Sequence, residues 1–508
     1  MRALSHSTII RRVRRAFCVL LVFCSIAPGP IARADVGRPP DRGKPQPILR
    51  VQAGGPTSEI FQLEFSPDGK TLYAAGRDKV IHVWTLREPS GDAGPHLQYR
   101  PDLVRRVPIA PGRWGNLDAL AVSPDGRWIA AGGYGAVTSL VADYRMPGFL
   151  YSSDLDLLSP EQAEEQGLIY LFDTTQTERT VVLRGHRGPV VGLTFANFDG
   201  KPRLVSAATE DSHNPRIVLR VWDIESGRTI QAFDPPPPAS GFSKSAPHEL
   251  QAWTAHGQQY VAFCSWDAGM AEATQRLRLF NLTSGKPEGP DRPLYAWCCP
   301  LSANGDGQLL LGTHATSKRP PRLVGWSGSG LATYWEAPLD HSITYLRPID
   351  DRRVALVVLD NKTRGYELIV RDLKASSATR AASIRLGPWP NPRVAVSRAG
   401  FLAVGGNPRH EIEIYPLARD ERANLEQRPV QRLAAAGQVF TDVTFVQKER
   451  ESGLRLTELV DGQVRTQLLM NLTASRLEKD AAAWSAWVPD LAAWGLNRPL
   501  GGRRRLDV

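Results

Sequence analysis

The sequence predicts an all-β fold built from one repeated unit, on three observations. Two segments, Phe61 to Trp84 and Val190 to Asp223, share one order of features: apolar alternation, a Pro/Asp/Gly-type turn, a strand of small residues, an acidic turn, and a strand ending in Trp. Period-two alternation bounded by Gly, Pro, Asp and Asn dominates the chain. Beyond the N-terminal segment, no long stretch has the 3.6-residue apolar period of a helix.

The second copy of the unit is the fuller one. Gly185-His186 opens it and Trp222-Asp223 closes it. Here the chain resembles the WD40-repeat family, whose units begin with Gly-His, end with Trp-Asp and run for about 40–45 residues. The resemblance implies a β-propeller, in which successive four-stranded sheets pack around a common axis.

Counting the units that start with an alternating strand gives the number of blades. The spacing between starts runs from roughly 46 to 73 residues, longer than the family's unit. We therefore expect a seven-bladed WD40-like β-propeller with a C-terminal extension. The seven starts lie near Phe61, Leu117, Val190, Leu250, Ala296, Ile343 and Val394. Third strands of the last two units are expected at Leu368 to Leu373 and at Ile412 to Leu417.

Two inserts account for much of the extra length. Residues 137–166 contain an acidic, helix-compatible piece, and residues 235–246 begin with four prolines, which cannot form a central strand. An open ring would leave exposed strand edges. Because Pro47 to Gly55 resembles Val181 to Gly188, the stretch before the third unit, we expect it to supply the outer strand of the last blade. The family closes its ring in this way.

The first residues look like an export signal rather than part of the fold. Five arginines precede the apolar stretch Ala16 to Ala27, which is too short to span a bilayer comfortably, and Ala32-Arg33-Ala34 is a cleavage-site pattern. We expect cleavage before Asp35. A loose twin-arginine signal at Arg14-Arg15, a poor lipobox and an uncleaved membrane anchor are the alternatives. The protein is thus expected to be periplasmic or extracellular.

The predicted organisation is therefore a signal peptide at 1–34, a linker at 35–46, the propeller at 47–437 and an extension at 438–508. The extension is either a further blade or appendage, or the start of another module. The net charge of +10 includes six signal-segment arginines and no acidic residue from that segment, so 56 basic against 52 acidic residues leave +4. This balance gives little support for nucleic-acid binding.

The remaining cysteines do not form a disulfide scaffold. Cys264, Cys298 and Cys299 are the three that follow the signal segment, and adjacent cysteines rarely bond to each other. A bond from Cys264 to either of the other two is conceivable. We favour buried, unbridged side chains.

The family resemblance assigns structural roles to several polar residues. It implies that His186, Ser206, Asp211 and Trp222 form a hydrogen-bonded chain inside one blade, which lets four buried polar groups satisfy one another. Asp78 and Trp84 keep the repeat signature in the first unit, as Gly185 and Asp223 do in the third. The first unit has Gly54-Gly55 in place of Gly-His and alanine in place of the serine. Its chain should be incomplete, and its packing should be apolar.

No catalytic or metal constellation is found. Gly325 to Gly330 superficially resembles a nucleophile elbow, but neither serine has glycine two residues before and two after it, so we expect a turn. The histidines are scattered without metal-ligand spacing. We expect no cofactor and no enzyme activity. The best hypothesis is an exported protein-interaction scaffold whose protein partner is unknown and contacts the inserts 137–166 and 235–246. The alternatives are a lactonase- or glycosidase-like propeller hydrolase with its site in the central channel, and one part of a longer multi-module protein.

Overall fold

The structure is a computed structural model with strands through most of the chain. It describes residues 54–470, except for gaps at 88–94, 109–113, 136–159, 178, 199, 211–215, 234–249, 256, 268–273, 289–291, 294–300, 304–307, 314–319, 328–331, 361, 374–381, 390, 418–427, 435–438, 449–450 and 461–462. The predicted signal peptide at 1–34, the linker at 35–46 and nearly all of both inserts lie outside the described residues. These assignments and the domain boundaries stay predictions.

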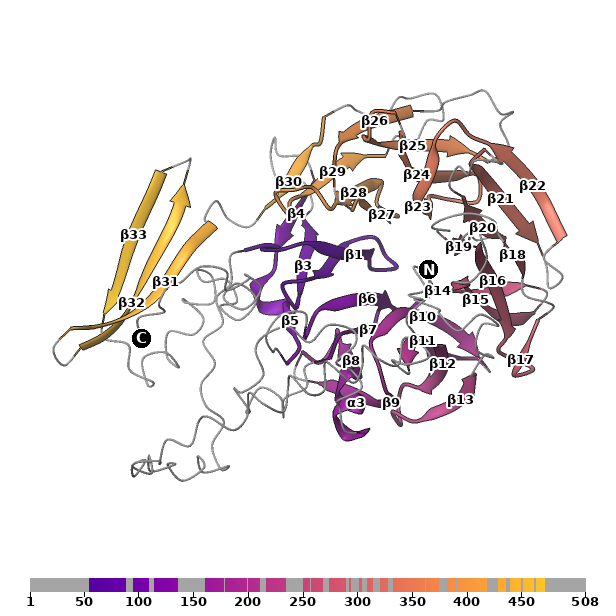
Figure 1. Ribbon diagram of the computed structural model, residues 1–508, viewed down its shortest axis with the longest axis horizontal. Helices are drawn as coiled ribbons and strands as arrows, with labels where there is room; N and C mark the ends of the chain where they lie inside the picture. The colour runs from indigo at the N-terminus through magenta and orange to yellow at the C-terminus, as the bar shows by residue number, and fades with distance from the viewer. Residues whose placement is uncertain are drawn as a thin grey trace, which may run out of the picture. The chain divides into compact units, whose positions relative to one another are not determined.

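Seven sheets of four sequential antiparallel strands make up the main body (Figure 1). We number them as blades 1 to 7. Blades 1 to 3 comprise β1 (Ile60–Phe65), β2 (Thr71–Gly76), β3 (Val80–Arg87) and β4 (His96–Tyr99); β6 (Leu117–Val122), β7 (Trp128–Gly133), β8 (Gly167–Asp173) and β9 (Thr180–His186); and β10 (Val190–Phe198), β11 (Lys201–Glu210), β12 (Arg216–Asp223) and β13 (Thr229–Phe233). The short β5 (Arg105–Arg106) pairs with β3 in blade 1.

The later blades repeat the same order. Blades 4 and 5 comprise β14 (Leu250–Ala255), β15 (Gln258–Asp267), β16 (Thr274–Asn281) and β17 (Lys286–Pro287), with β18 (Arg292–Pro293) beside β16; and β19 (Leu301–Ala303), β20 (Leu309–Gly312), β21 (Arg322–Ser327) and β22 (Ala332–Pro338). Blades 6 and 7 comprise β23 (Ser342–Pro348), β24 (Arg353–Leu359), β25 (Tyr366–Asp372) and β26 (Ala382–Gly387); and β27 (Arg393–Ser397), β28 (Phe401–Gly405), β29 (Ile412–Pro416) and β30 (Gln431–Leu433).

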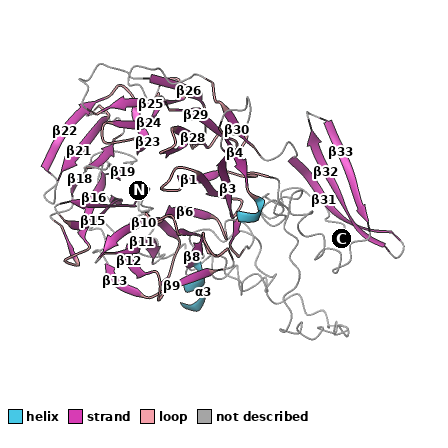
Figure 2. Cartoon of the chain, turned by 180° about the vertical axis from the view of Figure 1, so that it is seen from behind, coloured by secondary structure: helices cyan, strands magenta, loops and turns pink. Residues whose placement is uncertain are grey.

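The sequence prediction of seven blades is confirmed. Six of the seven expected starts fall within one residue of an inner strand, and the seventh, near Ala296, precedes β19 by five residues. The third strands expected at 368–373 and 412–417 are β25 and β29. The acidic piece of the first insert ends in the helix α3 (Pro160–Gln166), which lies beside β8 and β9 (Figure 2).

The inner strands close the ring. Each contacts the inner strand of the next blade in the order β1, β6, β10, β14, β19, β23 and β27, and β27 contacts β1 again. Within the described residues, seven apolar clusters fill the gaps, each shared by two neighbouring blades. The cluster between blades 7 and 1, for example, joins Trp84 and Leu63 to Ile412 and Leu433. Burial between blades therefore stabilises the ring.

Glycines let neighbouring blades approach closely. A Cβ on Gly312 of blade 5 would lie 2.6 Å from Ile343 of blade 6, and one on Gly192 of blade 3 would lie 2.8 Å from Leu250 of blade 4. A Cβ on Gly405 of blade 7 would lie 3.0 Å from Leu63. At these positions the absent side chain makes room for the apolar residue of the next blade.

The closure between the last and first blades differs from the prediction. The outer strand of blade 7 is β30, which follows β29 along the chain, rather than the N-terminal segment 47–55. Of that segment, only residues 54 and 55 are described, and they form a bend. Gln431 joins β30 to the outer strand of blade 1, because its Oε1 accepts from the Leu97 N–H (2.8 Å) and its Nε2 donates to the Leu97 carbonyl (2.7 Å).

The predicted extension contains a sheet of its own. Strands β31 (Val439–Lys448), β32 (Glu451–Val460) and β33 (Gln463–Met470) form a separate antiparallel sheet within the predicted extension.

The turn predicted at Gly325 to Gly330 is wrong in its first half, because Arg322–Ser327 is strand β21. Cys264 is buried in the core of blade 4, whereas Cys298 and Cys299 lie outside the described residues. A search of the described helices finds none long and apolar enough to cross a membrane.

Candidate functional site

A chain of hydrogen bonds joins His186, at the end of β9 in blade 2, to the interior of blade 3. Trp222 Nε1 lies 2.7 Å from Ser206 Oγ, Ser206 Oγ lies 2.7 Å from His186 Nε2, and His186 Nδ1 lies 2.8 Å from Glu210 Oε1. Three of the four residues predicted for this chain are thus brought together. The prediction that they lie inside one blade is wrong, because His186 belongs to the outer strand of blade 2 and the other two belong to blade 3. The carboxylate belongs to Glu210, one position before the predicted Asp211, which lies outside the described residues.

The order of donors and acceptors sets the state of the histidine. Trp222 can only donate, so Ser206 Oγ accepts from it and turns its own hydrogen to His186 Nε2. His186 Nδ1 then carries a proton and donates it to Glu210. Complete burial lowers the pKa of His186 from its usual 6.5, more than the hydrogen bond to Glu210 raises it. The neutral imidazole therefore fits its environment.

Glu210 completes the chain as a carboxylate. Burial by itself would raise the pKa of Glu210, but hydrogen bonds from His186 and from the backbone N–H of Arg187 outweigh burial and lower the pKa below its usual 4.5. Each polar group of the chain has a partner, which removes the free-energy cost of burying it.

The same geometry occurs in a nucleophilic triad, with Ser206, His186 and Glu210 in the order of nucleophile, base and orienting carboxylate. Burial argues against that role here. Ser206 and His186 are both 0% exposed, and the serine oxygen already accepts a bond from Trp222. A substrate carbonyl has no access to the hydroxyl in this structure.

Blade 1 solves the same packing problem with different residues. His82 on β3 lies 2.8 Å from Asp78 Oδ2 through Nε2 and 3.0 Å from the Tyr99 hydroxyl through Nδ1. Asp78 also accepts from the Thr57 N–H (3.1 Å). The predicted signature residue Trp84 is buried and packs edge-on against Tyr99, with ring centroids 5.4 Å apart. Apolar contacts pack this blade against both neighbours, as predicted, and the polar group around His82 is an addition that the prediction did not include.

The other signature residues lie near strand ends, Gly185 in blade 2 and Asp223 in blade 3. Gly185 has a φ of 144° at the end of β9, and a Cβ there would lie 3.4 Å from the Trp222 ring. Asp223 at the end of β12 accepts from the N–H and hydroxyl of Ser226. An arginine near the start of the second strand pairs with the aspartate that ends the third strand in three blades: Arg127 with Asp173, Arg203 with Asp223, and Arg352 with Asp372.

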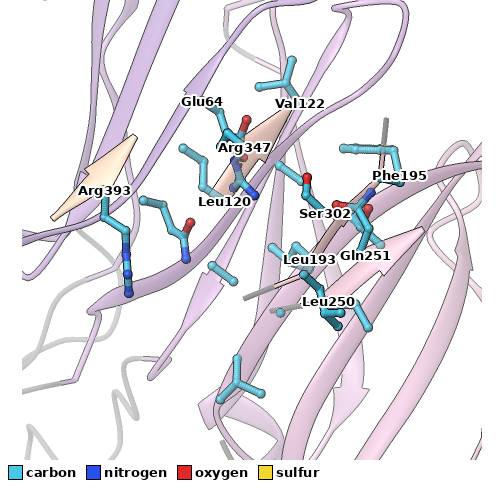
Figure 3. Close-up of a pocket in the computed structure, with 18 of the residues that line it drawn as sticks. Glu64, Leu120, Val122, Leu193, Phe195, Leu250, Gln251, Ser302, Arg347 and Arg393 are labelled. Atoms are coloured by element: carbon cyan, nitrogen blue, oxygen red, sulfur yellow. Dashed lines mark hydrogen bonds and ion pairs between the residues drawn. The ribbon is translucent and has the colours of Figure 1, made fainter. Parts of the chain in front are cut away.

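The central channel holds a cavity of about 320 Å³ that receives side chains from all seven inner strands. Its charged groups come from three adjacent blades: Glu64 on β1, Arg347 on β23 and Arg393 on β27. Arg347 Nη2 donates to Glu64 Oε1 at 2.9 Å. Figure 3 shows this pair together, with Leu193, Leu250, Gln251 and Ser302 on the other side of the cavity.

The lining does not supply a pair of acids. Glu64 is the one carboxylate among the described residues of the cavity, and no histidine lines it there. Burial raises the pKa of the Glu64 carboxyl, and the charge of Arg347 opposes the rise. A glycosidase needs two carboxyl groups across the bond it cleaves. In the described part of the chain, no group of three His, Cys, Asp or Glu residues could hold a metal ion.

The strand order places both inserts on one face. Each blade has four antiparallel strands, so all inner strands point from the same face of the ring to the opposite face. The connection from the second to the third strand therefore lies on the same face as the connection from the fourth strand to the next blade. The first insert joins β7 to β8, and the second joins β13 to β14. Both therefore leave the face that we call the insert face; the opposite face is the turn face.

Several of these residues escaped sequence analysis. His82 and Tyr99 lie outside the positions of the family signature, so their pairing with Asp78 has no local motif. Glu210 differs from the predicted acid by one position. Alternation along β11 puts Glu210 on the same side as Ser206, so this pattern could have favoured Glu210 as the acid. Arg347 and Arg393 meet at the channel because of the ring, since 46 residues separate them in the sequence.

Comparisons with known proteins agree with the repeat. The family model "WD domain, G-beta repeat" matches residues 46–85. Similar solved structures include the RRP9 WD40 repeats, at 17% identity, covering 70% of this chain and 89% of that one with a TM-score of 0.42. The C-terminal WD40 domain of Sif2 is 16% identical, with 84% and 98% covered and a TM-score of 0.45. The Myceliophteria thermophila Cps50 (Swd1) propeller is 15% identical, with 74% and 100% covered and a TM-score of 0.45.

Proposed function

We propose that this chain, a member of the WD40-repeat β-propeller family, is a non-catalytic scaffold for protein–protein interaction in the cell envelope. The observation that supports this most is the departure of both long inserts from one face of a rigid ring. Loops on a rigid framework commonly carry recognition. The N-terminal export pattern supports an envelope location.

The polar constellations of the blades fit a framework role. The chain of His186, Ser206, Glu210 and Trp222 is buried, and so is the pair of Asp78 and His82 in blade 1. The first group joins the outer strand of blade 2 to blade 3, the second joins strands within blade 1, and neither group lines the cavity. We infer that the protein partner contacts the insert face, with residues 137–166 and 235–246 as its main contacts.

A pair of deletions tests the proposal. Residues 137–159 are replaced by a short Gly-Ser linker. The replacement leaves α3 in the chain and keeps the backbone bond from the Gly135 N–H to the Gln166 carbonyl at the end of that helix. The matched control shortens residues 418–427, which join β29 to β30 on the turn face. Proteins cross-linked to each tagged variant in the cell envelope are then compared by mass spectrometry.

We expect both variants to unfold at the wild-type temperature, because neither deletion removes a described strand. The insert deletion should lose the specifically cross-linked partner, and the control should keep it. Capture of the same proteins at the same yield by the insert deletion would show that the insert is a solvated loop.

A further inference from the structure

We propose that the central channel binds a small oxyanion, a carboxylate or phosphate group, at Arg393. Among the described residues of the cavity lining, the charged ones are Glu64, Arg347 and Arg393, so one negative and two positive charges leave a net charge of +1. The other described lining residues are uncharged. Charge of one sign in a cleft with low-dielectric walls attracts the opposite ion.

Arg393 is the cation that remains for a ligand. Arg347 is paired with Glu64, whereas the described residues give Arg393 no carboxylate partner. Nε of Arg393 donates to the Phe61 carbonyl at 2.9 Å, and its guanidinium lies 5.0 Å from the centre of the Tyr345 ring. The carbonyl and the ring fix the orientation of the guanidinium, and its two terminal nitrogens remain as donors for a planar oxyanion.

The position of Arg393 fits entry from the insert face. Inner strands run from the insert face to the turn face, and Arg393 is the first residue of β27. Glu64 and Arg347 are each next to the last residue of their strands, so their ion pair lies nearer the turn face. Both arginines lie against the Tyr345 ring, with Arg347 4.9 Å and Arg393 5.0 Å from the ring centre. An anion from the insert face would therefore meet Arg393 first and the ion pair next.

The size of the cavity limits the ligand. A volume of about 320 Å³ is near the lower end of those that hold small molecules. Polar side chains of Gln251 and Ser302 lie across from the arginine wall (Figure 3). Together these features fit a short dicarboxylic acid or a phosphate ion. The hydroxyl of Ser302 and the amide of Gln251 would face the end of the ligand away from Arg393.

Isothermal titration calorimetry of the purified chain with succinate and, separately, with inorganic phosphate tests the site. The neutral diamide of succinate is the ligand control. We expect one-to-one binding of at least one oxyanion, none of the diamide, and weakening as salt rises. Which of the two binds identifies the source of the oxyanion.

Substitutions separate the site from a general charge effect. Arg393→Gln should weaken binding by about tenfold or more, since hydrogen bonds to charged groups are worth that much. The matched control is Arg398→Gln, which removes an exposed arginine from the turn at the other end of β27 and should leave binding unchanged. Should Arg393→Gln fold poorly, Arg393→Lys keeps the charge without the planar fork and should bind measurably more weakly than wild type.

Glu64→Gln gives a result that a structural role would not. It removes the negative charge of the channel and releases Arg347, so oxyanion binding should tighten by about tenfold. The proposal is overturned by the absence of binding of both anions at millimolar concentration, by equal binding to wild type and Arg393→Gln, or by weaker binding to Glu64→Gln. None of these outcomes depends on the proposed protein partner.

Discussion

Ser206 is the residue on which the interior of blade 3 depends. Its single hydroxyl accepts from Trp222 and donates to His186, so it links the third strand to the histidine that ends β9. The family pattern predicted three members of this chain from their positions in the repeat. It missed the acid by one residue. The alternation of side chains along the strand, and not the spacing in the sequence, decides which side chain faces the histidine.

Ser206→Ala should destabilise the protein by about 1–3 kcal/mol, because it leaves the buried Trp222 N–H and His186 Nε2 without partners. Denaturant unfolding followed by tryptophan fluorescence measures the change. Ser284→Ala is the control, since Ser284 is exposed and donates to Asn281 Oδ1 through its backbone N–H and not through its hydroxyl. Equal midpoints for both variants would contradict the role of Ser206.

Acid should weaken blade 3 in a defined direction. The unfolded chain protonates His186 as the pH falls below the usual 6.5, while burial keeps the folded residue neutral, so the unfolded state binds more protons and the free energy of unfolding falls with pH. Glu210, whose pKa is lowered, adds a loss in the same direction below its usual 4.5. Thermal unfolding at about pH 7.5 and about pH 5.5 compares wild type with His186→Gln.

The variant should be less stable than wild type at the higher pH but lose less stability between the two values, by up to about 1.4 kcal/mol for each unit of pKa shift. If its unfolding temperature falls as steeply as that of wild type, His186 does not supply the acid sensitivity.

At the scale of strands and blades, alternation predicted the elements well and their outer edges poorly. Inner strands carry several buried apolar residues and are bounded by turns, so their starts could be predicted to within a few residues. The outer strand β30 has three residues, and its sequence resembles a loop. Assignment of the last outer strand to the N-terminus failed because repeat similarity does not show which segment pairs with β29.

Gln431→Ala should loosen the junction between blades 7 and 1. The amide makes two bonds to the backbone of Leu97, and their loss should cost about 1–2 kcal/mol. Hydrogen–deuterium exchange should be faster at the Leu97 amide in β4 and in β30, with little change in blades 3 and 4. The exposed Gln176→Ala is the matched control. Unchanged exchange at Leu97 would show that apolar packing alone holds the junction.

At the scale of the whole molecule, seven similar sheets close a ring because each has an apolar face for both neighbours. Every described cluster of the core joins two blades, so no blade buries its faces alone. The charge balance belongs to this scale too, because the arginine-rich first residues account for six of the ten excess positive charges.

The N-terminal segment should be absent from the mature protein. Processing by a signal peptidase should leave Asp35 as the first residue and lower the net charge from +10 to +4. Intact-mass spectrometry of protein from the envelope measures the end directly. A mass that retains residues 1–34 would favour the uncleaved anchor.

By itself, the sequence determined the fold class, the number of blades and three members of the buried hydrogen-bonded chain, because alternation and repeat spacing act over short distances. Tertiary structure decided which residues meet across the ring. Gln431 reaches Leu97, and Arg347 reaches Glu64, over 334 and 283 positions respectively. Such contacts arise only when blade 7 packs on blade 1 and the inner strands surround one axis, and no local pattern encodes that closure.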